Sequence, residues 1–230
     1  MGRRQIPVPQ ALERALDTAL DKALGTERPL VLAYLERLRA RHPGATPAEI
    51  VVLLEKHYRA AVVAIGAASG SAAAVPAIGT AATVATAGAE IAAFVSATGM
   101  YVLALAELHR IPVSDPQIRR ALVLGTLVGA AGTPALADVG AGGGAWAHVI
   151  NRPDREGAVA ALNNRLGRLL LTRFGTRQGA LAVGRALPMG VGAGIGAVGN
   201  AALARGAIAA ARRAFGAAPR SFGPRIIDLG

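Results

Sequence analysis

Three polar residues stand among small apolar neighbours and are the side chains best placed to do chemistry: Glu90, Asp138 and Asn200. A carboxylate removed from water must find hydrogen bonds or a cation, or else hold its proton. We therefore consider a shared polar site inside the protein, with Arg185 or Arg168 as its counter-charge. The alternative is a structural role, in which Asp138 caps a helix beside its Gly-rich segment. For Asp138 we favour capping, and for Glu90 both interpretations stay open.

The residues that usually build metal and nucleophile sites are scarce. The chain has no cysteine, which excludes disulfides, thiolate metal sites and cysteine nucleophiles and fits a reducing compartment. No two histidines lie three or four residues apart, so none forms a helical metal pair. We interpret His109, which follows Glu107 near a predicted helix end, as a cationic cap. We predict no metal and no catalytic residue.

The run Gly190–Gly196 superficially resembles a dinucleotide-binding fingerprint, with Gly192 and Gly194 followed by Ala197. That fingerprint requires a preceding strand in a βαβ unit, whereas this run follows a predicted helix and Pro188. A P-loop lysine is also missing, since the only lysines are two distant ones, Lys22 and Lys56. The sequence therefore predicts no cofactor.

Three long stretches around the polar residues consist mainly of Ala and Gly and are almost free of charge. Ala60–Ala106 holds only Glu90, Ala121–Ile150 holds only Asp138, and Ala186–Ala204 holds no charged residue. Side chains this small let helix backbones approach closely, in lipid or in a dry core. Each stretch also contains a proline that should interrupt a helix: Pro76, Pro134 and Pro188.

No stretch alternates apolar and polar residues over the length of a strand, so we predict an all-α fold. We expect a compact bundle of long Ala/Gly-rich helices broken at the prolines. Residues 1–45 should form an N-terminal amphipathic helical arm, residues 46–218 the helical domain, and residues 219–230 a loosely ordered tail.

Two helix starts have clear signals. In Thr46-Pro47-Ala48-Glu49 the Thr46 hydroxyl can accept from the Glu49 amide while the Glu49 carboxylate accepts from the Thr46 amide. Pro47 suits the first helical position, where its missing N–H costs nothing. Ser114 or Asp115 should cap a later helix in the same way.

The net charge of +11 is concentrated in the last third of the chain. Residues 151–230 carry 12 basic and 3 acidic side chains, and all the basic ones are arginine. Such a surface attracts anionic lipid, although an ordinary solvated surface is the alternative. Specific nucleic-acid binding is not expected, because no motif and few aromatic residues support it. The predicted lipid contacts are Arg165, Arg168, Arg173, Arg177, Arg212 and Arg213.

Every apolar stretch is marginal as a transmembrane span. About 20 mostly apolar residues are needed, and Ala186–Ala204 has that length but few strongly apolar members. Ile91–Ala106 is richer, but Glu90 stands at its edge, and a carboxylate in mid-bilayer costs roughly 2.5–3.5 kcal/mol. A tightly packed hairpin, inserted shallowly or folded on itself, fits these facts better than a simple span. The N-terminal residues do not resemble a signal peptide.

Several of these segments resemble the EcsC protein family. The central runs are Ala74–Thr80, Gly88–Phe94 and Leu105–His109, and the closing runs are Gly184–Gly190 and Gly194–Asn200. The likeness extends over most of the chain. It implies a hydrophobic, helical bacterial protein of the kind encoded beside an ABC-type transporter linked to secretion. No biochemical activity and no catalytic residue come with it. The family's glycine-proline-aspartate turn would correspond to Gly132–Asp138.

Three hypotheses follow. The first is a bacterial helical protein at the inner membrane or its cytoplasmic face, acting through lipid or protein contacts. The second is a soluble, cytoplasmic all-α module that binds a hydrophobic ligand or a partner protein. The third, ranked last, is an enzyme that uses Glu90 or Asp138. The oligomeric state stays open.

Overall fold

The computed structural model describes residues 28–72, 80–111, 113, 115–128, 156–170 and 191–222, with residues 14, 18, 20, 21 and 25 before them. Within these ranges every regular element is an α-helix, which confirms the predicted all-α fold. Asp138, Arg185, Arg173 and Arg177 lie outside the described residues, as do the breaks expected at Pro76, Pro134 and Pro188.

Long helices dominate the structure. They are α2 (Arg28–Arg41), α3 (Pro47–Ala72), α4 (Thr80–Leu108), α5 (Pro116–Val128), a helix over residues 156–170, and α9 (Val191–Phe215). α3 ends at Ala72 and α4 begins at Thr80, and Pro76 lies between them outside the described residues.

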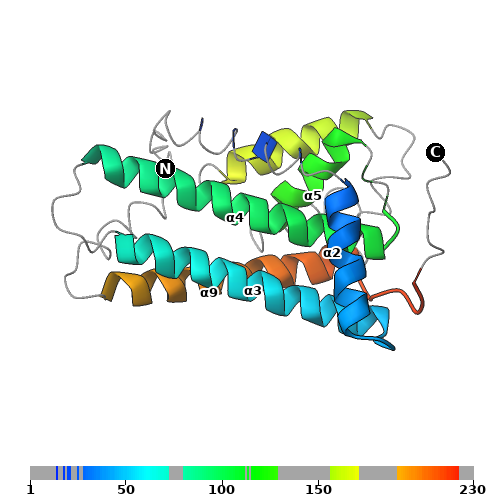
Figure 1. Cartoon of the computed structure of the whole chain (residues 1–230). Helices are drawn as coiled ribbons and strands as arrows, with labels where there is room; N and C mark the ends of the chain where they lie inside the picture. The colour runs from blue at the N-terminus through cyan, green and yellow to red at the C-terminus, as the bar shows by residue number, and fades with distance from the viewer. Residues whose placement is uncertain are drawn as a thin grey trace.

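The three longest helices lie side by side along the bundle (Figure 1). α3 packs most extensively against α9 and also against α4, while α4 contacts α5 and α9. α2 runs across the end of the bundle where α3 begins and α4 ends, and it packs on α4. The chain directions are therefore antiparallel, with α3 leaving the α2 end and α4 and α9 returning to it.

The start of α3 has the hydrogen bonds that the sequence predicted. The Thr46 amide donates to Glu49 Oε2 at 2.7 Å, and the Glu49 amide donates to Thr46 Oγ1 at 3.3 Å. These bonds with Thr46 also lower the pKa of the exposed Glu49 carboxyl group. At α5, Asp115 Oδ1 accepts the amide of Gln117 at 2.8 Å, so Asp115 is the cap.

Two helices end in a left-handed residue. After α4 that residue is Arg110, with φ 56°, and after α9 it is Gly216, with φ 76°. At the end of α4 the amide of Ile111 donates to the carbonyl of Ala106 at 2.9 Å, and the Arg110 amide donates to the carbonyl of Glu107 at 3.2 Å. These two hydrogen bonds provide donors for carbonyl groups that would otherwise have no partner at the helix end.

One apolar core joins all these helices. α5 is buried from Ala121 to Val128, and α4 is buried from Tyr101 to Ala106. α2 reaches the same core cluster through its apolar stripe, and α3 and α9 contribute along their facing sides. The members from α2 are Val31, Leu35 and Leu38, each at most 6% exposed. The apolar side chains of this cluster are thus removed from water within a single bundle.

Candidate functional site

Glu90 and Asn200, two of the polar residues that the sequence singled out, lie together in the bundle. Asn200 Nδ2 donates to Glu90 Oε1 at 3.3 Å and to the backbone carbonyl of Val62 at 3.2 Å. Glu90 is 9% exposed and Asn200 is 3% exposed. One amide thus connects α3, α4 and α9. The two other members of the expected site, Asp138 and Arg185, lie outside the described residues.

A second polar cluster, which the sequence analysis missed, lies closer to the α2 end. Glu55 on α3 is only 3% exposed and accepts two hydrogen bonds from Arg212 on α9, from Nε at 2.7 Å and from Nη2 at 2.5 Å. The arginine side chain itself remains 63% exposed. The hydrogen bonds to Glu55 raise the pKa of Arg212. A buried carboxylate is thus covered by a cation that faces water.

Two tyrosines extend this cluster into the core. Tyr58 and Tyr101 stack with ring centroids 4.6 Å apart and an interplanar angle of 9°. Tyr58 Oη is 3.0 Å from Thr98 Oγ1, and Thr98 also donates to the carbonyl of Phe94 at 2.8 Å. The buried Tyr101 hydroxyl has no hydrogen-bond partner among the described residues. Burial, followed by the nearby Glu55 carboxylate, raises the pKa of Tyr101, so this phenol stays neutral.

The sequence did contain a signal for Glu55. It lies three residues before Tyr58 and seven before Val62, on the stripe that α3 buries. A charged residue at such a position requires a partner, and only a basic residue on a neighbouring helix can supply the opposite charge. Which of the 12 arginines of residues 151–230 takes that part depends on the pairing of α3 with α9. Arg212, expected as a lipid contact, fills this structural position.

His109 lies at the end of α4, as expected, but in a different environment. Its ring contacts Phe215 at the end of α9, with centroids 5.3 Å apart. Burial lowers the pKa of His109, which disfavours the cationic form that a cap at the helix end requires. Two other residues of this end form an ion pair between α2 and α4, Arg28 Nε to Glu107 Oε1 at 2.6 Å.

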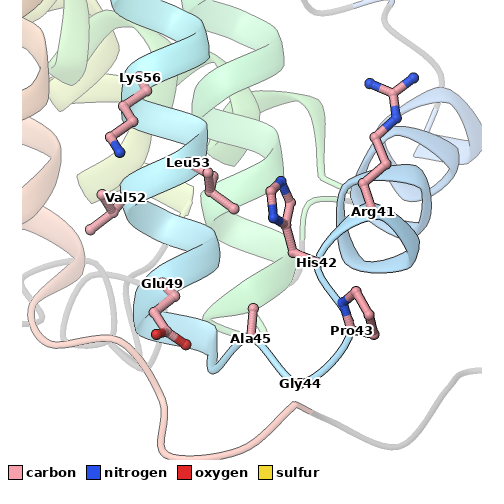
Figure 2. Close-up of a pocket in the computed structure, with 9 residues that line it drawn as sticks. All are labelled: Arg41, His42, Pro43, Gly44, Ala45, Glu49, Val52, Leu53 and Lys56. Atoms are coloured by element: carbon pink, nitrogen blue, oxygen red, sulfur yellow. The ribbon is translucent and has the colours of Figure 1, made fainter.

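An open hollow of about 660 Å³ lies at the turn between α2 and α3. Figure 2 shows Arg41 and Glu49 on opposite sides of it, with His42 between the two helices and Lys56 further along α3. The Glu49 carboxylate is already occupied by Thr46. The groups therefore do not converge on one point, as the polar groups of a ligand site usually do.

Among the described residues, both polar clusters are occupied by contacts between helices. In the described ranges no group of three His, Cys, Asp or Glu side chains is close enough to hold a metal ion. Glu55 is engaged by Arg212, and Glu90 by Asn200. A general base must reach a substrate proton, and both carboxylates lie under packed helices. What the two clusters can do is connect helices.

Several of the described carboxylates cap helices or bind partners on other helices, whereas many of the described basic side chains are exposed. Glu49 and Asp115 cap helices, and Glu55, Glu90 and Glu107 bind partners on other helices. Exposed basic residues lie on several helices instead: Arg37, Arg41, Lys56, Arg59, Arg165, Arg168, Arg205, Arg212 and Arg213. Of the predicted lipid contacts, Arg165 and Arg168 on the 156–170 helix and Arg212 and Arg213 on α9 lie on different sides of α4 (Figure 1).

One helix in the described part is long and apolar enough to cross a membrane, the stretch Ala89–Leu108 of α4. Within the bundle 67% of it is buried against other helices. The central helix of a water-soluble bundle has the same length and composition, so this stretch is weak evidence for a span.

Comparisons with known proteins provide no relative from which a function could be inferred. No protein-family model, no curated protein and no solved structure matches the chain.

Proposed function

We propose that this chain is a helical, EcsC-like protein that binds the surface of an anionic membrane and acts there through lipid or protein contacts. In a bacterium this surface would be the cytoplasmic face of the inner membrane, with an accessory role beside a transport or secretion system. The proposal includes no catalytic step.

The observation that carries the proposal is the excess of basic over acidic side chains on the described surface. Glu55 and Glu107 cancel the charges of Arg212 and Arg28, and among the other described residues the exposed basic side chains still outnumber the exposed carboxylates. Much of the net charge of +11 therefore acts on the surroundings. Each basic residue close to an anionic membrane contributes about 1 kcal/mol of attraction. Several such residues bind a membrane reversibly without a spanning helix.

The test is flotation of the purified chain with vesicles in the absence of detergent. We expect it to float with vesicles of phosphatidylcholine mixed with an equal part of phosphatidylglycerol, and to stay in solution with phosphatidylcholine alone. Raising the salt concentration should weaken the binding, because exposed charges are screened over about 10 Å at 0.1 M salt. Binding should not vanish at high salt if apolar contact contributes as well.

Equal recovery from both kinds of vesicle would contradict a role for anionic lipid. Complete recovery in the soluble fraction with both kinds would contradict membrane binding altogether. A lipid or partner protein found by native mass spectrometry in that soluble fraction would favour the second hypothesis, a soluble helical module that binds a hydrophobic ligand or a protein.

A further inference from the structure

Charged residues are distributed unevenly along the bundle axis, as well as between the interior and the surface of the bundle. Residues 60–72 of α3, residues 80–89 of α4 and residues 191–204 of α9 contain no charged side chain. These three segments gather at the end of the bundle opposite α2 (Figure 1). We call these three segments together the charge-free end. In the sequence, residues 60–89 contain no charged side chain.

On the exposed faces of α3 and α9, basic residues give way to alanine and valine where the charge-free end begins. On α3 the exposed residues Lys56 and Arg59 are followed by the exposed alanines 60, 64 and 68. On α9 Val198, which is 69% exposed, and the exposed Ala202 precede the exposed Arg205. The two helices are antiparallel neighbours, and the Asn200 bond to Val62 fixes their alignment. Arg59 and Arg205 therefore border the charge-free end at a similar level.

The length of the charge-free end limits what it can enter. At about 1.5 Å per residue, the 13 residues 60–72 of α3 extend roughly 20 Å. The hydrocarbon core of a bilayer is about 30 Å thick, so this end is too short to cross it and long enough to enter one leaflet. Glu90 is hydrogen-bonded to Asn200 at the inner limit of the segment, which keeps its carboxylate away from lipid.

We infer that the charge-free end inserts end-on into one leaflet of an anionic bilayer, with Arg59 and Arg205 at the level of the lipid headgroups. The inference rests on the proposed function and adds to it which part of the molecule enters the lipid and how far. An apolar segment together with neighbouring basic residues is the usual pair of signals for stable attachment without a span. Small side chains insert weakly by themselves, and the two arginines supply the second signal.

Labels at single cysteines measure the depth directly, because the chain has no cysteine of its own. Ala60, Ala64 and Ala68 are exposed on one face of α3, so each can be replaced by cysteine and labelled with a nitroxide without disturbing the core. With the full-length protein on phosphatidylcholine–phosphatidylglycerol vesicles, we expect depth to increase from Ala60 to Ala68 by about 12 Å, the rise of eight helical residues. A label at Ala40 on α2 should stay in water.

Equal depths at the three alanines would show that α3 lies flat on the membrane and would overturn the inference. Water-exposed labels on a protein that floats would overturn it as well, while leaving the proposed function intact. Failure of the protein to float at all would reject the proposed function first, and the inference with it. Each result thus identifies which of the two statements is wrong.

A matched pair of substitutions tests the same end through affinity. Val198→Glu places a carboxylate in the charge-free end, and Leu30→Glu makes the same charge change at the α2 end, where Leu30 is 54% exposed. A charge inside the hydrocarbon region is costly, so Val198→Glu should weaken vesicle binding about tenfold or more. Leu30→Glu should change it less than about twofold. Equal losses would indicate an effect of net charge alone and would overturn the inference.

Discussion

Two of the carboxylates that the structure describes are buried, and each is held by a side chain from α9. Glu55 on α3 binds Arg212, and Glu90 on α4 binds Asn200. A slide of α9 by one turn, about 5.4 Å, would separate both pairs at once. We interpret the two contacts as fixing the position of α9 along α3 and α4. Buried polar groups have this role in other helical assemblies. Surfaces built from alanine and glycine give few distinct shapes for packing alone to recognise.

Arg212→Ala should therefore destabilise the protein more than its exposed position suggests. The change leaves the Glu55 carboxylate buried without its cation. Breaking a fully buried pair costs about 3–5 kcal/mol, and we expect about 2–3 kcal/mol here because water still reaches the arginine side. Urea denaturation followed by circular dichroism measures this loss in the free energy of unfolding.

Two controls separate this effect from a general loss of positive charge. Arg213 is the next residue and is also exposed, so Arg213→Ala should change stability by less than about 0.5 kcal/mol. In a Glu55→Gln background, Arg212→Ala should cost clearly less than in the natural protein, because the buried charge is gone. Equal costs in both backgrounds would show that the pair does not stabilise the fold.

The residue-scale predictions succeeded where the partners are close in sequence. Thr46 and Glu49 are three residues apart, so the chain itself brings them together, and Asp115 similarly caps the helix that follows it. Glu90 and Asn200 were each recognised as unusual, since a polar residue among alanines is conspicuous. The partner of Glu55 lies 157 residues away, and no local pattern indicates which arginine reaches it.

At the scale of elements, helices with many glycines gain their stability from packing and lose some of it through backbone freedom. The sequence located the starts of α3 and α5 because capping residues mark them. It did not reveal which helix pairs with which, because the apolar stripes of these helices consist of nearly interchangeable small residues. The extensive contact between α3 and α9 is a result of the folded structure.

Two glycines offer a matched test of backbone freedom at this scale. Gly206 lies inside α9 and Gly44 in the turn before α3, and a Cβ atom at either site would meet nothing within 4 Å. Only Gly44 has a positive φ, at 87°. Gly206→Ala should therefore stabilise the protein by about 0.5–1 kcal/mol, since alanine loses less backbone entropy in a helix. Gly44→Ala should destabilise it by about 1 kcal/mol, because left-handed geometry is strained for alanine.

Chemical denaturation of the two variants and of the natural protein measures these changes in the free energy of unfolding. Neither substitution introduces a contact or a clash. Stability changes of opposite sign in the two variants would therefore show the effect of backbone conformation alone. A loss of stability in Gly206→Ala would mean that the middle of α9 approaches a neighbour more closely than its surroundings indicate.

At the scale of the whole molecule, α2 belongs to the same apolar core as the long helices. The sequence predicted a boundary at residue 45, with a helical arm before it. Val31, Leu35 and Leu38 nevertheless pack in one cluster with α3 and α4, and Arg28 binds Glu107. The position of a helix relative to the core depends on the loop that follows it and on the surface it meets, and neither is apparent from its own periodicity.

Removal of residues 1–45 should therefore destabilise the remaining chain. Each of three buried side chains of α2 contributes about 1.5–3 kcal/mol, an upper estimate because unfolded chains already bury some surface. In the full-length protein, Leu38→Ala should lower the melting temperature by about 10 °C, whereas Leu30→Ala, at a residue 54% exposed on the same helix, should leave it nearly unchanged. Calorimetry on the three variants measures these differences. An unchanged melting temperature for the shortened chain would instead establish α2 as an independent arm, and the boundary at residue 45 would then be a true domain boundary.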